Sequence, residues 1–160
     1  MRKKTLTKEQ ALQKLRHYCR YQERCHHEVE QKLWELGAKR SFHDEIISLL
    51  IEEGDLNEER FAMHFAGGKF RMLQWGKKKI YYALKEKRVS EYSIKKALKT
   101  IEEDQYMETI KGLAEKKYNI LKEDQYLVRK KKTVDYLLQK GFEATLINVI
   151  MQELTAAGNK

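Results

Sequence analysis

Apolar residues recur at spacings of three and four along almost the whole chain of 160 residues, and no proline interrupts them. This spacing predicts helices, because it places apolar side chains on one face of a coil that turns every 3.6 residues. Proline would break such helices, so its absence permits long ones. We therefore predict an all-α fold with nine helices, whose apolar faces lie at 11–19, 29–36, 46–51, 61–65, 80–84, 94–101, 107–114, 134–138 and 146–154.

Residues typical of helix ends flank these faces. Thr7–Gln10 forms a capping box, in which the hydroxyl and the glutamine side chain satisfy exposed backbone donors. Ser41 and Ser90 are expected to cap the third and sixth helices in a similar way. Left-handed glycines are expected to close three helices, at Gly37, Gly54 and Gly141.

The helical pattern repeats. Ile51–Leu56 recurs as Ile101–Tyr106, fifty residues later, and Leu33 is matched by Leu84 at a spacing of 51. A period near fifty with three helices in each period predicts an elongated tandem array of three three-helix repeats. The alternative is a single irregular helical bundle. The expected repeats are residues 1–56, a central basic repeat at 57–103, and 104–160.

The positive charge is concentrated in the central repeat. Lys69–Lys99 holds eleven Lys or Arg and two Glu, a surplus equal to the net charge of +9 of the whole chain. Such a surplus indicates an anionic partner. Lys77–Lys79 repel one another with no acid nearby in sequence, which favours a contact with that partner. A second basic run, Arg129–Lys132, has acidic neighbours that offset it.

Aromatic residues lie among these basic residues, at Phe70, Trp75, Tyr81, Tyr82 and Tyr92. Aromatic and basic side chains together can hold a single-stranded nucleic acid by stacking and charge. Large apolar side chains are more often buried, so we expect the first three of these aromatics to belong to the core.

Motifs for chemistry are incomplete. Gly67-Gly68-Lys69 lacks the earlier glycine, the following hydroxyl residue and the preceding strand of a phosphate loop, so these glycines are expected to break or bend the fourth helix. His17, Cys19, Cys25, His26 and His27 do not have the spacing of a structural zinc site. Cys19 is expected in the core and Cys25 at the start of the second helix. We predict a protein that is not an enzyme and needs no cofactor or metal.

The chain is expected to be cytoplasmic and not membrane-bound. The basic residues 1–4 are not followed by the apolar run of a signal peptide. The longest apolar stretch, Ile46–Ile51, contains Ser48 and is far too short to cross a bilayer.

Three separated motifs, in the right order, resemble the RecX family. Gly54–Phe65 is similar to the family's central pattern Gly-x-Leu-acidic-acidic-x-Arg-Phe-Ala-x-x-Phe. Arg24–Leu33 resembles its first-repeat pattern Arg-Ser-x-x-Glu-Leu-x-x-Lys-Leu, with Cys25 in place of the serine. Arg71, Gly76, Ile80 and Leu84 continue the central pattern, and the likeness runs from about Ala11 to the C-terminus.

The resemblance implies a regulator that binds in the groove of the RecA–DNA filament. Such a protein would limit filament extension and inhibit the ATPase, strand-exchange and coprotease activities of RecA, as a monomer. The alternative is a basic protein that binds naked single- or double-stranded DNA by itself. Phe61, Phe65, Ile80 and Leu84 are expected to hold the central repeat together. The expected contacts to the filament or DNA are Arg60, Lys69, Arg71, Lys77, Lys78, Lys79, Arg129, Lys130, Lys131 and Lys132, although Arg60 has an equal claim to a structural ion pair.

Overall fold

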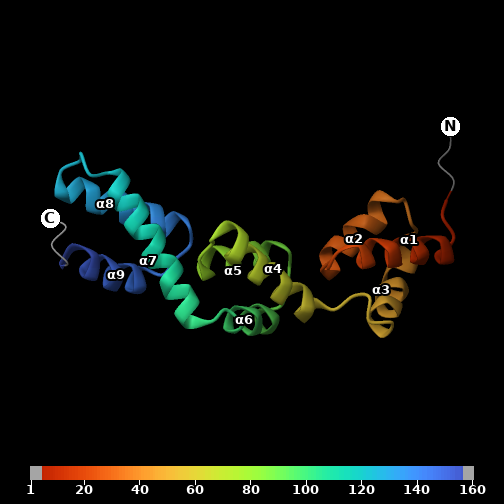
Figure 1. The fold of residues 1–160 in the computed structure, drawn as a ribbon. Helices are drawn as coiled ribbons and strands as arrows, with labels where there is room; N and C mark the ends of the chain where they lie inside the picture. The colour runs from red at the N-terminus through yellow and green to blue at the C-terminus, as the bar shows by residue number, and fades with distance from the viewer. Residues whose placement is uncertain (1–4, 157–160) are drawn as a thin grey trace. The chain divides into compact units, whose positions relative to one another are not determined.

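A computed structural model describes residues 5–156, and the regular structure of that part is entirely helical, with no strand (Figure 1). The prediction of an all-α fold is therefore confirmed. The basic start of the chain, residues 1–4, lies outside the described residues. The elements are α1 (Lys8–Tyr21), α2 (His26–Glu35), a 3-10 turn η1 (Arg40–Phe42), α3 (His43–Glu52), α4 (Glu58–Leu73), α5 (Lys77–Glu86), α6 (Glu91–Lys99), α7 (Glu103–Ile120), α8 (Tyr126–Gln139) and α9 (Ala144–Ala156).

The chain forms two compact units. The N-terminal unit consists of Met1–Phe65 with Leu84–Ala97, and the C-terminal unit of Ala66–Ala83 with Leu98–Lys160. In the first, α1, α2 and α3 pack on one another, and in the second α7, α8 and α9 do so (Figure 1). Helices α4, α5 and α6 contribute residues to both units. The expected repeat boundaries at residues 56 and 103 stay a prediction.

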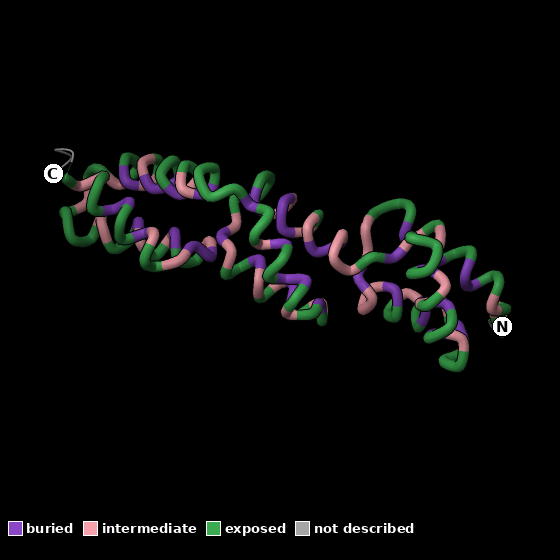
Figure 2. Tube along the Cα trace, turned by 90° about the horizontal axis from the view of Figure 1, so that it is seen from below, coloured by how far each residue is buried: buried purple, intermediate pink, exposed green. Residues whose placement is uncertain are grey.

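Buried positions fall on the apolar faces that the sequence indicates, and exposed positions separate them along each helix (Figure 2). Fully buried side chains of the N-terminal unit include Leu15, Val29, Leu33, Ile46 and Leu50, and those of the C-terminal unit include Ile80, Ile110, Tyr118, Leu137 and Ile147. Among the residues expected to hold the central helices, Phe61, Ile80 and Leu84 are buried. Phe65 is half-buried, with its ring 5.8 Å from that of Phe61.

The threefold repeat is visible in the turns between the second and third helix of each triplet. Each turn has one residue with a left-handed backbone, and the residue after it is buried. The N–H of that buried residue donates to the carbonyl of a buried leucine five positions earlier. This is the pattern of a Schellman helix end. The left-handed residues are Gly37 (φ 73°), Arg88 (φ 60°) and Gly141 (φ 97°). The hydrogen bonds are Ala38 to Leu33 at 3.0 Å, Val89 to Leu84 at 3.1 Å, and Phe142 to Leu137 at 3.2 Å.

Two of the expected helix caps are confirmed and one is wrong. The Thr7 hydroxyl accepts from the Gln10 backbone at 3.1 Å, and the Ser90 hydroxyl accepts from the Ser93 backbone at 3.2 Å. Ser41 does not cap α3, because it lies inside η1, which leads into the helix through Phe42. The first residue of α3, His43, is instead buried with its Nε2 3.1 Å from the carbonyl oxygen of Ala38.

The expected break at Gly67-Gly68 is wrong, because α4 continues through both glycines to Leu73. Each glycine costs a helix about 1 kcal/mol relative to alanine, and the buried neighbours Ala66 and Phe70 offset that cost by packing. Gly67 also makes room for a side chain of the same helix. A Cβ at this position would lie 2.8 Å from the Nη1 atom of Arg71, so the guanidinium rests against the glycine.

Both cysteines are buried where the sequence places them. Cys19 is a core residue of α1, and Cys25 precedes the first residue of α2. The Cys25 backbone N–H donates to Glu28 Oε1 at 3.1 Å, and its Sγ lies 3.8 Å from the carbonyl oxygen of Lys87. Burial raises the pKa of each thiol from 9.0 to about 11.

The buried thiols predict a loss of stability at alkaline pH. Well below pH 9 the thiols are neutral in both the folded and the unfolded chain, so their ionisation does not change the free energy of unfolding. Between pH 9 and 11 the unfolded thiols ionise while the folded ones do not, which lowers the free energy of unfolding by roughly 2 kcal/mol per cysteine. Urea unfolding at pH 8 and at pH 10.5 measures this loss. Cys19→Ala/Cys25→Ser should flatten the decline, and an equally steep decline in that variant would contradict the assignment.

Candidate anion-binding site

In the C-terminal unit, the start of α5 rests on the turn between α8 and α9. The backbone N–H of Gly76 donates to the Lys140 carbonyl at 2.7 Å, and that of Lys78 donates to the Gly141 carbonyl at 3.0 Å. The N–H of Lys77 donates to the hydroxyl of Tyr106 at 2.9 Å. We call this contact between Gly76–Lys78 and Lys140–Phe142 the joint. It satisfies backbone donors that have no partner within their own helix.

Two glycines let the backbones of the joint approach each other. A Cβ on Gly76 would lie 2.2 Å from the carbonyl carbon of Gly141, and a Cβ on Gly141 would lie 2.4 Å from the Cβ of Lys79. Real Cβ atoms do not come so close to other heavy atoms. Any larger residue at either position would therefore push α5 away from the turn.

Tyr106 of α7 holds the joint together. Its side chain is almost completely buried, and its hydroxyl accepts from Lys77 and donates to Glu143 Oε1 at 2.6 Å. Burial, together with the hydrogen bond to Glu143, raises the pKa of Tyr106 far above its ordinary value. The hydroxyl therefore stays protonated and keeps both hydrogen bonds at physiological pH.

Five lysines lie in the joint or next to it, and we call them the lysine cluster: Lys69, Lys77, Lys78, Lys79 and Lys140. The ammonium groups of Lys69 and Lys79 lie 5.1 Å and 4.7 Å from the ring centroid of Trp75, within the range of cation–π attraction. Lys77 Nζ lies 4.8 Å from the ring of Tyr106, and Lys140 Nζ donates to the Leu73 carbonyl at 2.7 Å. Lys78 and Lys79 are exposed.

The lysine cluster is electrostatically strained. The N-terminus of a helix carries a partial positive charge, and the first turn of α5 holds three lysines and no acid. Within residues 5–156, no acidic side chain forms an ion pair with any of Lys77, Lys78, Lys79 or Lys140. Burial, and then the charge of Lys79, lower the pKa of the Lys140 ammonium. An anion would relieve this repulsion through the ammonium groups, because the joint already occupies the backbone N–H groups of Gly76, Lys77 and Lys78.

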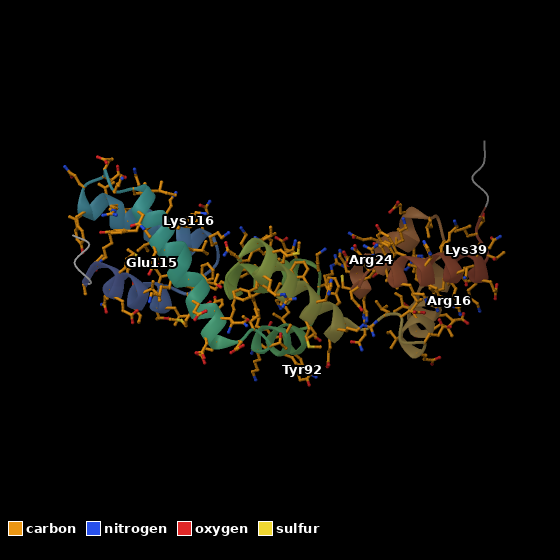
Figure 3. The ribbon with its side chains drawn as sticks, viewed as in Figure 1. Arg16, Arg24, Lys39, Tyr92, Glu115 and Lys116 are labelled. Atoms are coloured by element: carbon orange, nitrogen blue, oxygen red, sulfur yellow. The ribbon has the colours of Figure 1, made fainter. Side chains whose placement is uncertain are left out.

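The aromatics of the basic region divide between core and surface. Phe70 is buried, as expected, with its ring 5.7 Å from that of Tyr106. Trp75 and Tyr81 are half-buried, so the expectation that they belong to the core is only partly met for both. Tyr82 and Tyr92 are exposed; Tyr92 is labelled on α6 in Figure 3.

Arg60 belongs to the N-terminal unit and not to the lysine cluster. Its Nε donates to Glu23 Oε1 at 2.6 Å, and its Nη2 donates to the Gly54 carbonyl at 2.9 Å. The first bond ties the start of α4 to the segment after α1, and the second ties it to the turn after α3. Of the two interpretations open for Arg60, the structural ion pair is the one that this geometry matches.

Removing Arg60 should destabilise the N-terminal unit. Glu23 Oε2 is buried and has no hydrogen-bond partner among the described residues, so Arg60→Ala would leave both oxygens of that carboxylate without a bond. We expect the free energy of unfolding to fall by about 1–3 kcal/mol in urea titrations. Lys95→Ala is the matched control, because its ion pair with Glu91 is exposed and 3.9 Å long and should contribute little. Equal losses in the two variants would rule out a structural role for Arg60.

The remaining predicted contacts are mostly engaged within the chain. Arg129 Nε donates to the Tyr118 carbonyl at 2.7 Å, with the guanidinium 3.5 Å from the ring centroid of the same tyrosine. Lys131 pairs with Asp135 at 2.8 Å and Lys132 with Asp124 at 2.9 Å, while Lys130 is half-buried. Arg71 is exposed beside a groove of about 350 Å³ that Glu108 also lines.

Lys140 belongs to the cluster, although its sequence context does not single it out. Its position immediately before a helix-ending glycine is a weak signal. That position indicates that Lys140 lies at a turn, but it does not indicate which part of the chain the turn contacts. Within the described part of the chain, no group of three His, Cys, Asp or Glu side chains could hold a metal ion. No helix there is long and apolar enough to span a membrane.

The fold and this site define a class: a basic protein built from consecutive three-helix units. Two family models match this chain. They are the second three-helix domain of RecX, at residues 57–98, and the third three-helix domain of RecX, at residues 103–151. The chain is 37% identical over 131 residues to a regulatory protein RecX of Clostridium perfringens, covering 80% of this chain and 60% of the relative. It is 28% identical over 137 residues to one of Bacillus cytotoxicus, covering 86% and 51%.

Solved structures agree with the family models. The crystal structure of RecX from Lactobacillus salivarius matches with a TM-score of 0.86 and 29% identity, covering 93% of this chain and 97% of that one. This chain belongs to the RecX family, a family of regulatory proteins. It spans between half and three fifths of the length of the two curated relatives named above.

Proposed function

We propose that this chain binds the RecA–DNA filament and inhibits its extension, together with the ATPase, strand-exchange and coprotease activities of RecA. Membership of a family of regulatory proteins supports a regulatory role. To that regulatory role we add the partner, the RecA–DNA filament, and the effect on it, inhibition. The chain would act in the cytoplasm, as a monomer, by binding alone and without catalysis.

The observation that carries the proposal is the lysine cluster at the joint. Lys78 and Lys79 are exposed at the positive end of α5 and have no acidic partner among the described residues. A filament that contains DNA presents phosphates, which neutralise such a cluster and release counterions. The joint fixes the backbone of Lys78 and Lys79, so little backbone ordering is needed on binding.

The direct test is an ATPase assay with purified RecA on circular single-stranded DNA. Titrating the full chain at amounts below one molecule per RecA should slow ATP hydrolysis, since a bound regulator that stops extension affects many subunits. Filament length measured by electron microscopy should fall in parallel. Unchanged hydrolysis and unchanged filament length at saturating chain would overturn the proposal.

The alternative is autonomous binding to naked DNA. It predicts tighter binding to bare DNA than to preformed filament, with an affinity that falls by about one logarithmic unit per phosphate contact for each tenfold rise in salt. Competition between labelled filament and unlabelled DNA at matched nucleotide concentration separates the two functions. Preference for the filament supports regulation, and preference for naked DNA supports the alternative.

A further inference from the structure

A second basic surface lies in the N-terminal unit and shares no residue with the lysine cluster. Helices α1 and α2 and the segment that joins them line an open groove of about 630 Å³. The side chains that give it its chemical character are Lys14, His17, Tyr18, Tyr21, Arg24 and Lys32. None of the side chains that line this groove is acidic.

The groove follows from the spacing of residues on α1. Lys14, His17, Tyr18 and Tyr21 lie at intervals of three and four, so they share one face of the helix. The neighbouring face carries the buried residues Leu15 and Cys19, which hold α1 against the other helices of the unit. The groove-lining face therefore lies beside the core, and of its residues Tyr18 also packs against that core.

Arg24 and Tyr18 form a flat surface in the groove. The Arg24 guanidinium carbon lies 3.7 Å from the centroid of the Tyr18 ring, and its Nε donates to the Tyr18 carbonyl at 3.2 Å. Lys32 Nζ lies 5.4 Å from the same ring. Figure 3 labels Arg24 in the segment between α1 and α2. The guanidinium is thus held in contact with an aromatic ring, an arrangement on which a nucleobase can stack.

Tyr21 adds a second aromatic side chain to the groove lining. Its side chain is 78% exposed, although it lines the same groove as Arg24 and Tyr18. The same helix face carries the exposed ammonium group of Lys14 and the exposed imidazole of His17. The Lys32 ammonium is 3.5 Å from Glu35, a loose surface pair that leaves most of its charge available.

The geometry points to a binding site for single-stranded nucleic acid in this groove, with one base stacked on Tyr21, another on the Arg24–Tyr18 pair, and the phosphates beside Lys14 and Lys32. Unpaired bases have exposed faces for stacking, whereas the bases of a duplex are already stacked and enclosed. An acidic peptide would use the charges but not the aromatic surfaces. The site goes beyond the proposed function, because it requires neither RecA nor the lysine cluster.

The test measures fluorescence anisotropy of a labelled oligothymidylate of about ten nucleotides, a length typical of small single-strand sites. The full chain carries Lys78→Glu/Lys79→Glu in this assay, so that the lysine cluster does not contribute. Tyr21→Ala should weaken binding about tenfold, the effect typical of removing one base stack, and Tyr21→Phe should keep the affinity. Lys14→Glu should weaken binding and reduce the salt dependence by about 0.7 of a logarithmic unit.

Lys39→Glu is the matched control, because it makes the same charge change on an exposed residue of the same unit, outside the groove. It should bind as the parent does, and circular dichroism should show equal helix content for all variants. Three outcomes would overturn the site: unchanged binding by Tyr21→Ala, equal affinity for a duplex of the same length, or equal competition by polyglutamate. None of these depends on ATP hydrolysis by RecA, so this site and the proposed function can fail separately.

Discussion

Gly141→Ala should lower the free energy of unfolding of the C-terminal unit by about 3 kcal/mol. Two costs add at this position. The backbone has φ of 97°, which a residue with a Cβ adopts only under strain of about 1 kcal/mol. The new Cβ would also overlap the Cβ of Lys79, and relieving that overlap costs a further 1–3 kcal/mol or so. Urea unfolding followed by circular dichroism at 222 nm measures the loss.

Variants at other glycines distinguish the cost of backbone strain from the cost of the Cβ overlap. Gly37 has φ of 73° but no atom near its added Cβ, so Gly37→Ala should lower stability by only about 1 kcal/mol. Gly112 lies inside α7 with open space around it, and Gly112→Ala should stabilise the chain by up to about 1 kcal/mol. If Gly141→Ala were no less stable than Gly37→Ala, the close approach of α5 to the turn would be excluded.

Sequence periodicity predicts the helices well because it reports directly on which faces are buried. Leu33, Leu84 and Leu137 are equivalent in sequence and also in structure, since each accepts the hydrogen bond that ends the second helix of its triplet. The left-handed position that follows is glycine in two triplets and Arg88 in the third. That third turn could not be predicted from residue type, because surrounding packing imposes a backbone that arginine alone would avoid.

The lysine cluster was only partly predictable for a related reason. A run such as Lys77–Lys79 is visible as charge in the sequence, but the joint brings it to Lys140, more than sixty residues away. Arg129 shows the converse difference between sequence and structure. In sequence it belongs to a basic run, whereas in the structure it closes the end of α7 through the Tyr118 carbonyl and ring. Charge patterns identify cations, and only tertiary contacts show which of them already have partners.

Reversing the charge of the two exposed lysines, Lys78→Glu/Lys79→Glu, should reduce inhibition of the RecA ATPase about a hundredfold in effective concentration. Each ammonium near a phosphate gains about 1 kcal/mol in water, and a carboxylate there is repelled by a similar amount, before screening by salt. The slope of log affinity against log salt should fall by about two, one for each phosphate that is no longer neutralised. Lys77 is left unchanged, because its backbone and side chain contact Tyr106, and a carboxylate there would approach Glu143.

Lys111→Glu/Lys116→Glu gives the same charge change on exposed residues of α7 in the same unit (Lys116 is labelled in Figure 3). This control should inhibit RecA as the parent chain does, and both double variants should keep their helix content and their urea midpoint. An equal reduction of inhibition in the two variants would mean that net charge, and not the lysine cluster, governs binding. Full inhibition by Lys78→Glu/Lys79→Glu would place the contact surface elsewhere, because a contact made by these two lysines could not survive the reversal of both charges.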